Sequence, residues 1–584
     1  MNSAFFRIVD WFGRGPRLGT VAGFMLTAMT GCFGGPADDG SVTKEELGRS
    51  AAGAYLAGSF ARAQHDTTVA ANYFVAAFGK DPSDVNLLKR AFFALLADGR
   101  VRDALALADR VAKANPRSGT ANLLLAAEHM REGRTEAALE RLAVSHNADQ
   151  VGMLRPIILA WALAAKGDTE GALKALGQLA DRGHLASFRN FHAGSINEMG
   201  GKTSDAEAAL RALVGAEGSG ALRSVEALGT LLERAGRADE AETVYRAYLR
   251  RFPDNPVALE LLRRAQSKTP AAPFFRNAVD GIAEAFYQAA GVYFAENIRE
   301  LPETYAHVAV HLRPDFSAAR ILIAEIKESQ NQWPEALDAY KAVAAASPYG
   351  WIARLRAALA LDRNDKIGEA EGLLRAMIAE RPERADAAST LGDIYRGRER
   401  WIDAARAHDV AIARLQPATE RHWLLYFVRG QSLERAKEWE RAEPDFLKAL
   451  ELRPDQPIVL NYLGYSWVDQ GLHLARARRM IERAVEQRPQ DGAIVDSLGW
   501  VLFRLGKYQE AVEQLERAVV LRPGDATIND HLGDALCVVG RQEEAVFQWK
   551  RALTLSPEPE LVPKIEHKLR DGFAAPTPLA ETGS

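Results

Sequence analysis

Three consecutive stretches near the end of the chain repeat one pattern. Residues 463–489 read LGYSWVDQGLHLARARRMIERAVEQRP, residues 498–523 read LGWVLFRLGKYQEAVEQLERAVVLRP, and residues 532–557 read LGDALCVVGRQEEAVFQWKRALTLSP. Two residue types recur in this region every 34 residues: the alanines Ala484, Ala518 and Ala552, and the prolines Pro489, Pro523 and Pro557. A fixed period of this length is typical of a solenoid of helix pairs. The sequence therefore predicts an all-α superhelix of stacked, antiparallel helix pairs.

Small residues inside each stretch have a structural purpose. The glycine after the first leucine (Gly464, Gly499, Gly533) lacks a side chain, which lets the two helices of a pair cross closely. A second glycine (Gly471, Gly506, Gly540) falls where the first helix ends, and glycine adopts the left-handed conformation required there at little cost. The prolines follow the second helix, which they cannot continue. This combination resembles the tetratricopeptide repeat.

The same signature continues towards the N-terminus with less regularity, which predicts the organisation of the chain. We expect a degenerate helical-repeat array at 44–266 and a linker at 267–277, where two prolines interrupt the period. A second, more regular tetratricopeptide-repeat array follows at 278–557. A capping helix at 558–573 is expected to cover the last repeat, and 574–584 to be a disordered tail.

Composition excludes some classes of partner. The net charge is −4, with 47% hydrophobic and 26% charged residues, as in a folded globular chain. There is no basic run, so nothing indicates a nucleic-acid partner.

The first 43 residues differ from the rest. Arginines precede a mainly apolar stretch at 18–29 that is too short to span a bilayer, and small residues then precede Cys32. The pattern resembles a bacterial lipoprotein signal, which implies a signal peptide at 1–31, lipidation of Cys32, and a flexible tether at 32–43. An ordinary signal peptide with an incidental cysteine, or an uncleaved anchor, is the alternative.

The residue after Cys32 indicates a location. Phe33 stands where the lipoprotein rule would place aspartate for retention at the inner membrane, so the resemblance implies the outer membrane, on its periplasmic face. Cys537 is the other cysteine in the sequence. After lipidation of Cys32 no intrachain disulfide remains possible, and we expect Cys537 to be a small core residue.

Patterns of catalytic or metal chemistry are weak. The segment 194–203 ends in Gly-Lys-Thr, but its glycine spacing does not fit a phosphate loop, so a helix-to-helix turn is expected. His307 and His311 share one helical face, as two zinc ligands can, without an evident third ligand. We expect no enzymatic activity, no metal and no cofactor.

A binding groove is the remaining candidate site. In the repeat family, fixed positions of each first helix line the inner wall of the superhelix. In this chain the resemblance places there Asn461, Tyr465, Asp469, Asp496, Trp500, Arg504, Asp530 and Asp534. An aromatic anchor among carboxylates suits a peptide groove. Alternatively, Tyr465 and Trp500 simply pack between repeats.

The resemblance extends to a narrower group. The lipid anchor, the long helical array, and the segments 460–465 and 496–500 are similar to the LbcA-like outer-membrane lipoproteins. Those proteins are adaptors that bind a periplasmic carboxy-terminal processing protease and bring it cell-wall hydrolases. The resemblance therefore implies a non-catalytic scaffold that binds other proteins or peptides. A scaffold for polysaccharide export or pilus assembly, and a transferase with a repeat-array arm, are the alternatives.

Overall fold

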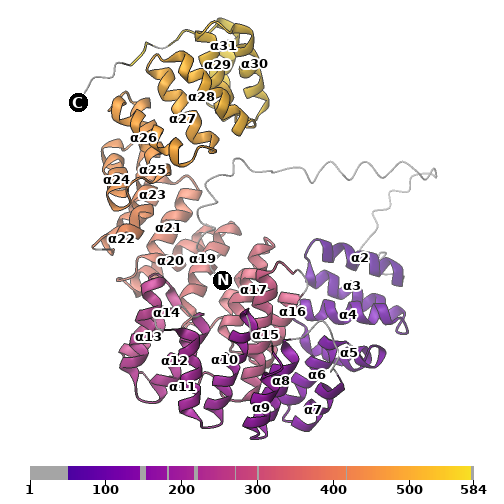
Figure 1. Ribbon diagram of the computed structural model, residues 1–584. Coiled ribbons are helices and arrows are strands. Elements are labelled where there is room, and N and C mark those ends of the chain that lie inside the picture. The colour runs from indigo at the N-terminus through magenta and orange to yellow at the C-terminus, as the bar shows by residue number, and fades with distance from the viewer. Residues whose placement is uncertain are drawn as a thin grey trace, which may run out of the picture. The chain divides into compact units, whose positions relative to one another are not determined.

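The computed structural model describes most of the chain after residue 49 (Figure 1). The described residues are 50–116, 118–144, 153–179, 183–215, 221–269, 271–298, 301–415, 417–575 and 577–579. Within these ranges all regular secondary structure is helical, which confirms the all-α prediction. The predicted signal peptide, Cys32 and the tether at 32–43 lie outside the described residues. No described helix combines the length and the apolar composition that crossing a membrane requires.

The chain forms two compact units, Met1–Lys366 and Ile367–Ser584, which are described separately. The helices of unit 1 are α2 (Ala51–Ala63), α3 (Thr67–Lys80), α4 (Val85–Ala97), α5 (Val101–Ala114), α6 (Gly119–Arg131), α7 (Thr135–Val144), α8 (Leu154–Ala165), α9 (Thr169–Leu176), α10 (Gly183–Met199), α11 (Thr203–Val214), α12 (Leu222–Arg234), α13 (Ala238–Arg251), α14 (Pro256–Gln266), α15 (Ala278–Ala295), α16 (Leu301–Leu312), α17 (Ser317–Ser329), α18 (Trp333–Lys341) and α19 (Gly350–Arg363).

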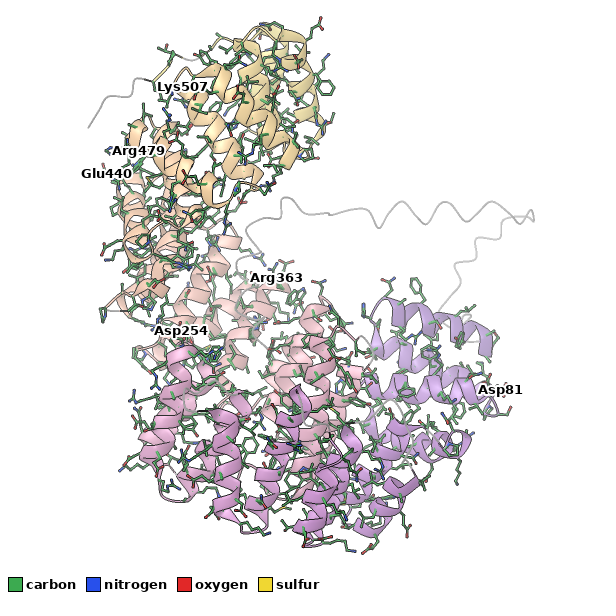
Figure 2. The ribbon with its side chains drawn as sticks, viewed as in Figure 1. Asp81, Asp254, Arg363, Glu440, Arg479 and Lys507 are labelled. Atoms are coloured by element: carbon green, nitrogen blue, oxygen red, sulfur yellow. The ribbon has the colours of Figure 1, made fainter. Side chains whose placement is uncertain are left out.

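Unit 2 continues the same helix-pair pattern to the C-terminus. Its helices are α20 (Ile367–Glu380), α21 (Asp386–Gly397), α22 (Trp401–Ala413), the short 3₁₀ helix η3 (Glu420–His422), α23 (Trp423–Arg435), α24 (Trp439–Leu452), α25 (Pro457–Asp469), α26 (Leu474–Gln487), α27 (Gly492–Arg504), α28 (Tyr508–Leu521), α29 (Ala526–Val538), α30 (Gln542–Thr554) and α31 (Val562–Asp571). In the pairs from α21 to α30, the odd-numbered helix is the first helix and the even-numbered one the second. Glu440 on α24 and Arg479 on α26 are exposed and lie at the outer margin of this unit (Figure 2).

Close helix crossings depend on the predicted glycines. A Cβ atom placed on Gly499 of α27 would lie 2.5 Å from Cγ of Leu515 on α28, closer than non-bonded carbons can approach. Leu515 and Ala518, also on α28, are completely buried. The absence of a side chain at Gly499 therefore permits the pair to form, as the repeat pattern predicts.

The turns between paired helices use the left-handed backbone conformation. Gly506 has φ of +76° and Gly540 has φ of +87°, as expected for glycines that end a first helix. The corresponding turns before α22 and α24 contain no glycine, and there Glu399 (φ +59°) and Lys437 (φ +63°) adopt the same conformation. The repeat geometry therefore determines the turn even where a side chain makes it costly.

In unit 1, helices α15, α16 and α19 pack on the inner face of several preceding helix pairs. This face is formed by the first helices, which carry even numbers from α2 to α14. Helix α15 packs against α6 and α8, α16 packs against α4 to α6, and α19 packs against α14. Helices α6 and α12 are buried on both sides, because residues 119–127 of α6 and 224–232 of α12 are all buried, whereas Leu56 and Phe60 of α2 are exposed. From α4 to α14, much of the inner face of this array is thus covered by later helices of the chain itself (Figure 1).

A buried ion-pair cluster stabilises the packing of α15 on the first array. Arg223 of α12 forms an ion pair with Glu284 of α15, whose side chain is completely buried. Arg223 also binds Glu226 at 2.6 Å, and the hydroxyl of Tyr349 donates to Glu226 at 2.9 Å. Burial alone would lower the pKa of Arg223, but the charges of Glu284 and Glu226 raise it above its ordinary value.

The segment around 267–277 packs into unit 1. Phe274 is buried, and the rings of Phe274 and Phe275 contact Phe191 of α10, while Phe275 also contacts Trp161 of α8. This segment was predicted as a linker because the repeat phase is lost there. The compact units of the structure divide elsewhere, after Lys366, because α15 to α19 pack onto the first array.

Candidate binding wall

The predicted wall residues lie on three successive first helices of unit 2. Helix α25 packs against α27, and α27 packs against α29, so that the three helices form one continuous surface. The positions two before and two after the Leu-Gly leucine fall on one side of each helix. The wall residues are Asn461, Tyr465 and Asp469 on α25, Asp496, Trp500 and Arg504 on α27, and Asp530 and Asp534 on α29.

At α29 this wall is covered by the chain's own capping helix. Lys568 of α31 donates to both oxygens of Asp530 at 2.8 Å and to Asp534 at 2.8 Å. Ile565 of α31 is completely buried, and residues 528–537 of α29 are all buried. Asp530 and Asp534 therefore form an internal ion-pair cluster beneath α31, whereas the sequence suggested that they face an open groove.

Asp534 has a strongly altered acidity in this cluster. Its Oδ1 accepts a hydrogen bond from the indole N–H of Trp549 at 2.9 Å. Burial and the neighbouring Asp530 carboxylate raise the pKa of Asp534 to about 6, against the opposing charge of Lys568. The end of the wall therefore carries a carboxyl group that titrates near neutral pH.

The middle of the wall is a histidine–carboxylate pair with an aromatic stack. His531 of α29 is buried, and its Nδ1 lies 3.0 Å from Oδ1 of Asp496 on α27. Although burial alone would lower the pKa of His531, the Asp496 carboxylate raises it. The ring of Trp500 stacks on His531 with centroids 4.1 Å apart, and on Phe503 at 5.3 Å. Trp500 thus packs between repeats, as the alternative interpretation proposed, while it remains half-buried at the surface.

The part of the wall at α25 is open. Asn461 and Tyr465 are half-buried and Asp469 is exposed. The guanidinium of Arg504, on α27, lies 3.7 Å from the Asp469 carboxylate. Burial and the charges of Asp496 and Asp469 raise the pKa of the Tyr465 hydroxyl, which therefore stays protonated.

Three polar atoms of the open part are buried without a hydrogen-bond partner in the described part of the chain. They are Oδ1 of Asn461, Nε1 of Trp500 and Nε of Arg504. Buried polar atoms are normally hydrogen-bonded, because an unpaired one costs about 1–3 kcal/mol. The open part of the wall therefore contains one acceptor and two donors that are covered and unpaired, beside half-buried aromatic rings.

Other residues that the sequence singled out have structural contacts. His311 of α16 lies 2.9 Å from Oε2 of Glu128 on α6, and His307 lies 3.8 Å from Glu303. No group of three or more metal-ligating side chains occurs among the residues that the structure describes. Residues 194–203 comprise the end of α10, a turn and the start of α11, as predicted. Cys537 is buried in α29, which confirms it as a core residue.

Sequence reasoning missed the residues that pair with the carboxylates of the wall. Lys568 and His531 lie outside the positions that line the inner face of each repeat, and Lys568 comes from a helix beyond the last repeat. The available signal was a lysine three residues after the apolar Ile565, on the same face of the capping helix. Only the packing of α31 on α30, beside α29, reveals that its amine reaches two carboxylates.

The fold defines a repeat protein of stacked helix pairs, in which successive first helices of unit 2 form one continuous wall. The profile of the tetratricopeptide repeat family matches residues 93–148, 200–256, 321–385, 383–457, 427–491, 463–526 and 497–557, which together comprise more than half of the chain. The chain belongs to the tetratricopeptide repeat family.

Individual relatives are more distant. The TPR repeat-containing protein PA4667 of Pseudomonas aeruginosa is 26% identical over 197 residues, which are 33% of this chain and 32% of that protein. The chain thus matches about a third of that relative's length. Among solved structures, a chain of the APC/C hetero-tetramer Cut9–Hcn1 is 15% identical, with 84% of this chain and 97% of that one covered and a TM-score of 0.35. Yeast Tom70 is 15% identical, with coverage of 89% and 95% and a TM-score of 0.28. At these scores neither superposition bears on function.

Proposed function

We propose that this protein is a non-catalytic adaptor that holds a partner protein on the wall formed by α25 and α27. Tetratricopeptide repeats generally bind other proteins or peptides, which supports the class of function. The observation that carries the proposal is the set of unpartnered polar atoms on Asn461, Trp500 and Arg504 beside half-buried aromatic rings. A partner's main chain can pair these covered atoms once the side chains of Asn461, Trp500 and Arg504 turn towards it, and its apolar side chains can cover the rings.

The adaptor is anchored by lipid on Cys32 to the outer membrane and faces the periplasm. The sequence pattern before Cys32 supports this location. Its partner is a carboxy-terminal processing protease, to which it brings cell-wall hydrolases, as the resemblance to LbcA-like lipoproteins implies. The mechanism is local concentration, because two proteins held beside each other meet far more often without any new chemistry.

The test of the wall uses two substitutions in the full chain. Trp500→Ala removes the aromatic surface, and Asp469→Lys reverses an exposed charge beside Arg504. Together they are expected to weaken binding of a purified carboxy-terminal processing protease by at least about 2 kcal/mol, roughly thirtyfold in Kd. Asp496 is left unchanged, because it is buried against His531 and a lysine there would disrupt the fold.

The matched control is Glu513→Lys, on the exposed face of the second helix α28, which should bind the protease as the wild type does. Circular dichroism must show equal helicity in all variants. If the double variant keeps wild-type affinity, the wall formed by α25 and α27 is not the docking surface. The anchor is tested separately by mass spectrometry of the N-terminal peptide, which should begin at an acylated Cys32; a mature chain that begins elsewhere excludes this anchor.

A further inference from the structure

The segment that follows α31 lies across the ends of the helices that form the wall. Helix α31 ends at Asp571, and Gly572 has φ of +86°, which redirects the chain. The ring of Phe573 then packs 6.0 Å from Trp549 of α30 and 6.3 Å from Phe503 of α27, measured between centroids. Phe573 therefore lies beside the same aromatic residue, Phe503, on which Trp500 stacks.

Further along, this segment contacts the ends of α27 and α25. The backbone amide of Leu579 donates to the carbonyl of Arg504 at 2.8 Å. Arg504 is the last residue of α27, so its carbonyl has no acceptor role within the helix and is free to bind an extended segment. A Cβ atom on Gly506 would lie 3.1 Å from Pro578, and one on Gly471, after α25, would lie 3.8 Å from the Leu579 side chain.

These contacts are weak compared with those that fill unit 1. Phe573 and Leu579 are half-buried, while Thr577 and Pro578 are exposed. Among the described residues of 573–579, Leu579 contributes the only backbone hydrogen bond to the repeats that is recorded for this segment. Such a contact is held mainly by its covalent connection, which keeps the segment at a high local concentration. A competing segment with the same chemistry can therefore displace it.

We propose that this surface, formed by Phe503, Arg504, Gly506, Gly471 and Trp549, binds an extended partner segment that carries an aromatic residue followed by a Pro-Leu pair. The chain's own Phe573, Pro578 and Leu579 occupy the surface and compete with the partner. The proposal rests on the proposed function, because the surface includes Arg504 and adjoins Trp500. Beyond that function, it specifies the chemistry of the partner segment and states that a segment of the chain itself competes with this partner.

The experiment measures binding of a labelled peptide with the sequence GFAAPTPLAETGS, residues 572–584, to the full chain by fluorescence anisotropy. In the variant Phe573→Ala/Leu579→Asp the chain's own segment loses its ring contact and its apolar contact. We expect this variant to bind the peptide at least about tenfold more tightly than the wild type, because the tethered competitor is removed. The control Thr577→Ala changes an exposed side chain and should bind as the wild type does.

Several outcomes overturn the proposal. The proposal is wrong if the double variant and the wild type bind the labelled peptide with equal affinity. It is also wrong if a scrambled peptide, in which Phe, Pro and Leu change places, binds as tightly as the original peptide. If the double variant loses helicity, Leu579→Asp alone replaces it, because Phe573 then stays on Trp549. Failure of peptide binding, while Trp500→Ala/Asp469→Lys still loses the protease, removes this inference and leaves the proposed function intact. Peptide binding without an effect of that variant on the protease removes the proposed function instead.

Discussion

The inner face of the first array in unit 1 and the wall at the end of unit 2 are built from the same repeat but have different environments. In unit 1 the indole N–H of Trp161 donates to Nδ1 of His192 at 3.0 Å, and Nε2 of His192 donates to Gln288 of α15 at 3.2 Å. In unit 2 the corresponding donor of Trp500 has no partner within the described residues. The repeat therefore places equivalent side chains on the first helices. Whether these side chains become core or stay at a surface depends on whether another segment of the chain packs on them.

The packing of α15 against α8 in unit 1 shows how the inner face of first helices becomes part of the core. A Cβ atom on Gly281 of α15 would lie 2.1 Å from the Trp161 ring, so the ring of α8 occupies the space that a side chain at position 281 would need. Burial lowers the pKa of His192 to about 3, and this histidine is consequently neutral. In unit 2, α31 packs on α30 and reaches α29 through Lys568, and the wall residues of α25 stay half-buried or exposed.

The largest expected effect comes from breaking the ion-pair cluster that holds α15 on the first array. Arg223→Ala leaves the completely buried Glu284 without its cation. We expect a loss of about 3–5 kcal/mol in the free energy of unfolding, because an unpaired buried charge is costly. Hydrogen exchange should show reduced protection in α12 and α15. The control Arg234→Ala removes a more exposed ion pair with Glu198 and should cost less than about 1 kcal/mol. Unchanged protection in α15 would mean that the ion-pair cluster does not stabilise the packing of α15 on the first array.

A smaller effect is expected from pH at the covered end of the wall. Asp534 binds its proton more tightly in the folded state, with a pKa of about 6 against an ordinary 3.8, so its favourable contribution is present below pH 4 and is lost as pH rises through 6. His531 also has a raised pKa and changes stability in the same direction. Amides of α29 and α31 should therefore be more protected at pH 5 than at pH 7.5, by on the order of 1–3 kcal/mol after correction for intrinsic exchange.

Asp534→Asn provides the matched comparison for this pH effect. Asparagine cannot titrate, so the difference between the two pH values should become smaller in this variant. A pH dependence that is the same in the variant and the wild type would assign the effect to other groups. It would also show that the cluster of Asp530, Asp534 and Lys568 does not tune how firmly α31 covers α29.

The smallest expected effect concerns the turns of unit 2. Lys437 has φ of +63° at a turn where other repeats have glycine, such as Gly506. Lys437→Gly removes a strain of about 1–2 kcal/mol but adds unfolded-state entropy worth about 0.5–1 kcal/mol, so a net gain of at most about 1 kcal/mol is expected. Urea denaturation measures it. Lys437→Ala keeps the strain and should give no gain; if it stabilises equally, strain at this turn is not the cause.

The sequence by itself determined the repeat, because its signature depends on local requirements. Gly499 is needed for one crossing and Gly506 for one turn, and both needs are satisfied within a single helix pair. The helical solenoid and the placement of the wall residues on successive first helices were therefore predictable. Membrane location and the signal at Cys32 stay predictions.

Only the tertiary structure decided which inner faces are filled. The packing of α15 onto α6 and α8, and the reach of Lys568 to Asp530 and Asp534, join residues that are far apart in sequence or lie beyond the repeat. A repeat pattern describes contacts between neighbouring helices, and it contains no information about a segment that returns to the inner face from further along the chain. For this reason the open part of the wall at α25 and α27 could be separated from its covered end at α29 only in three dimensions.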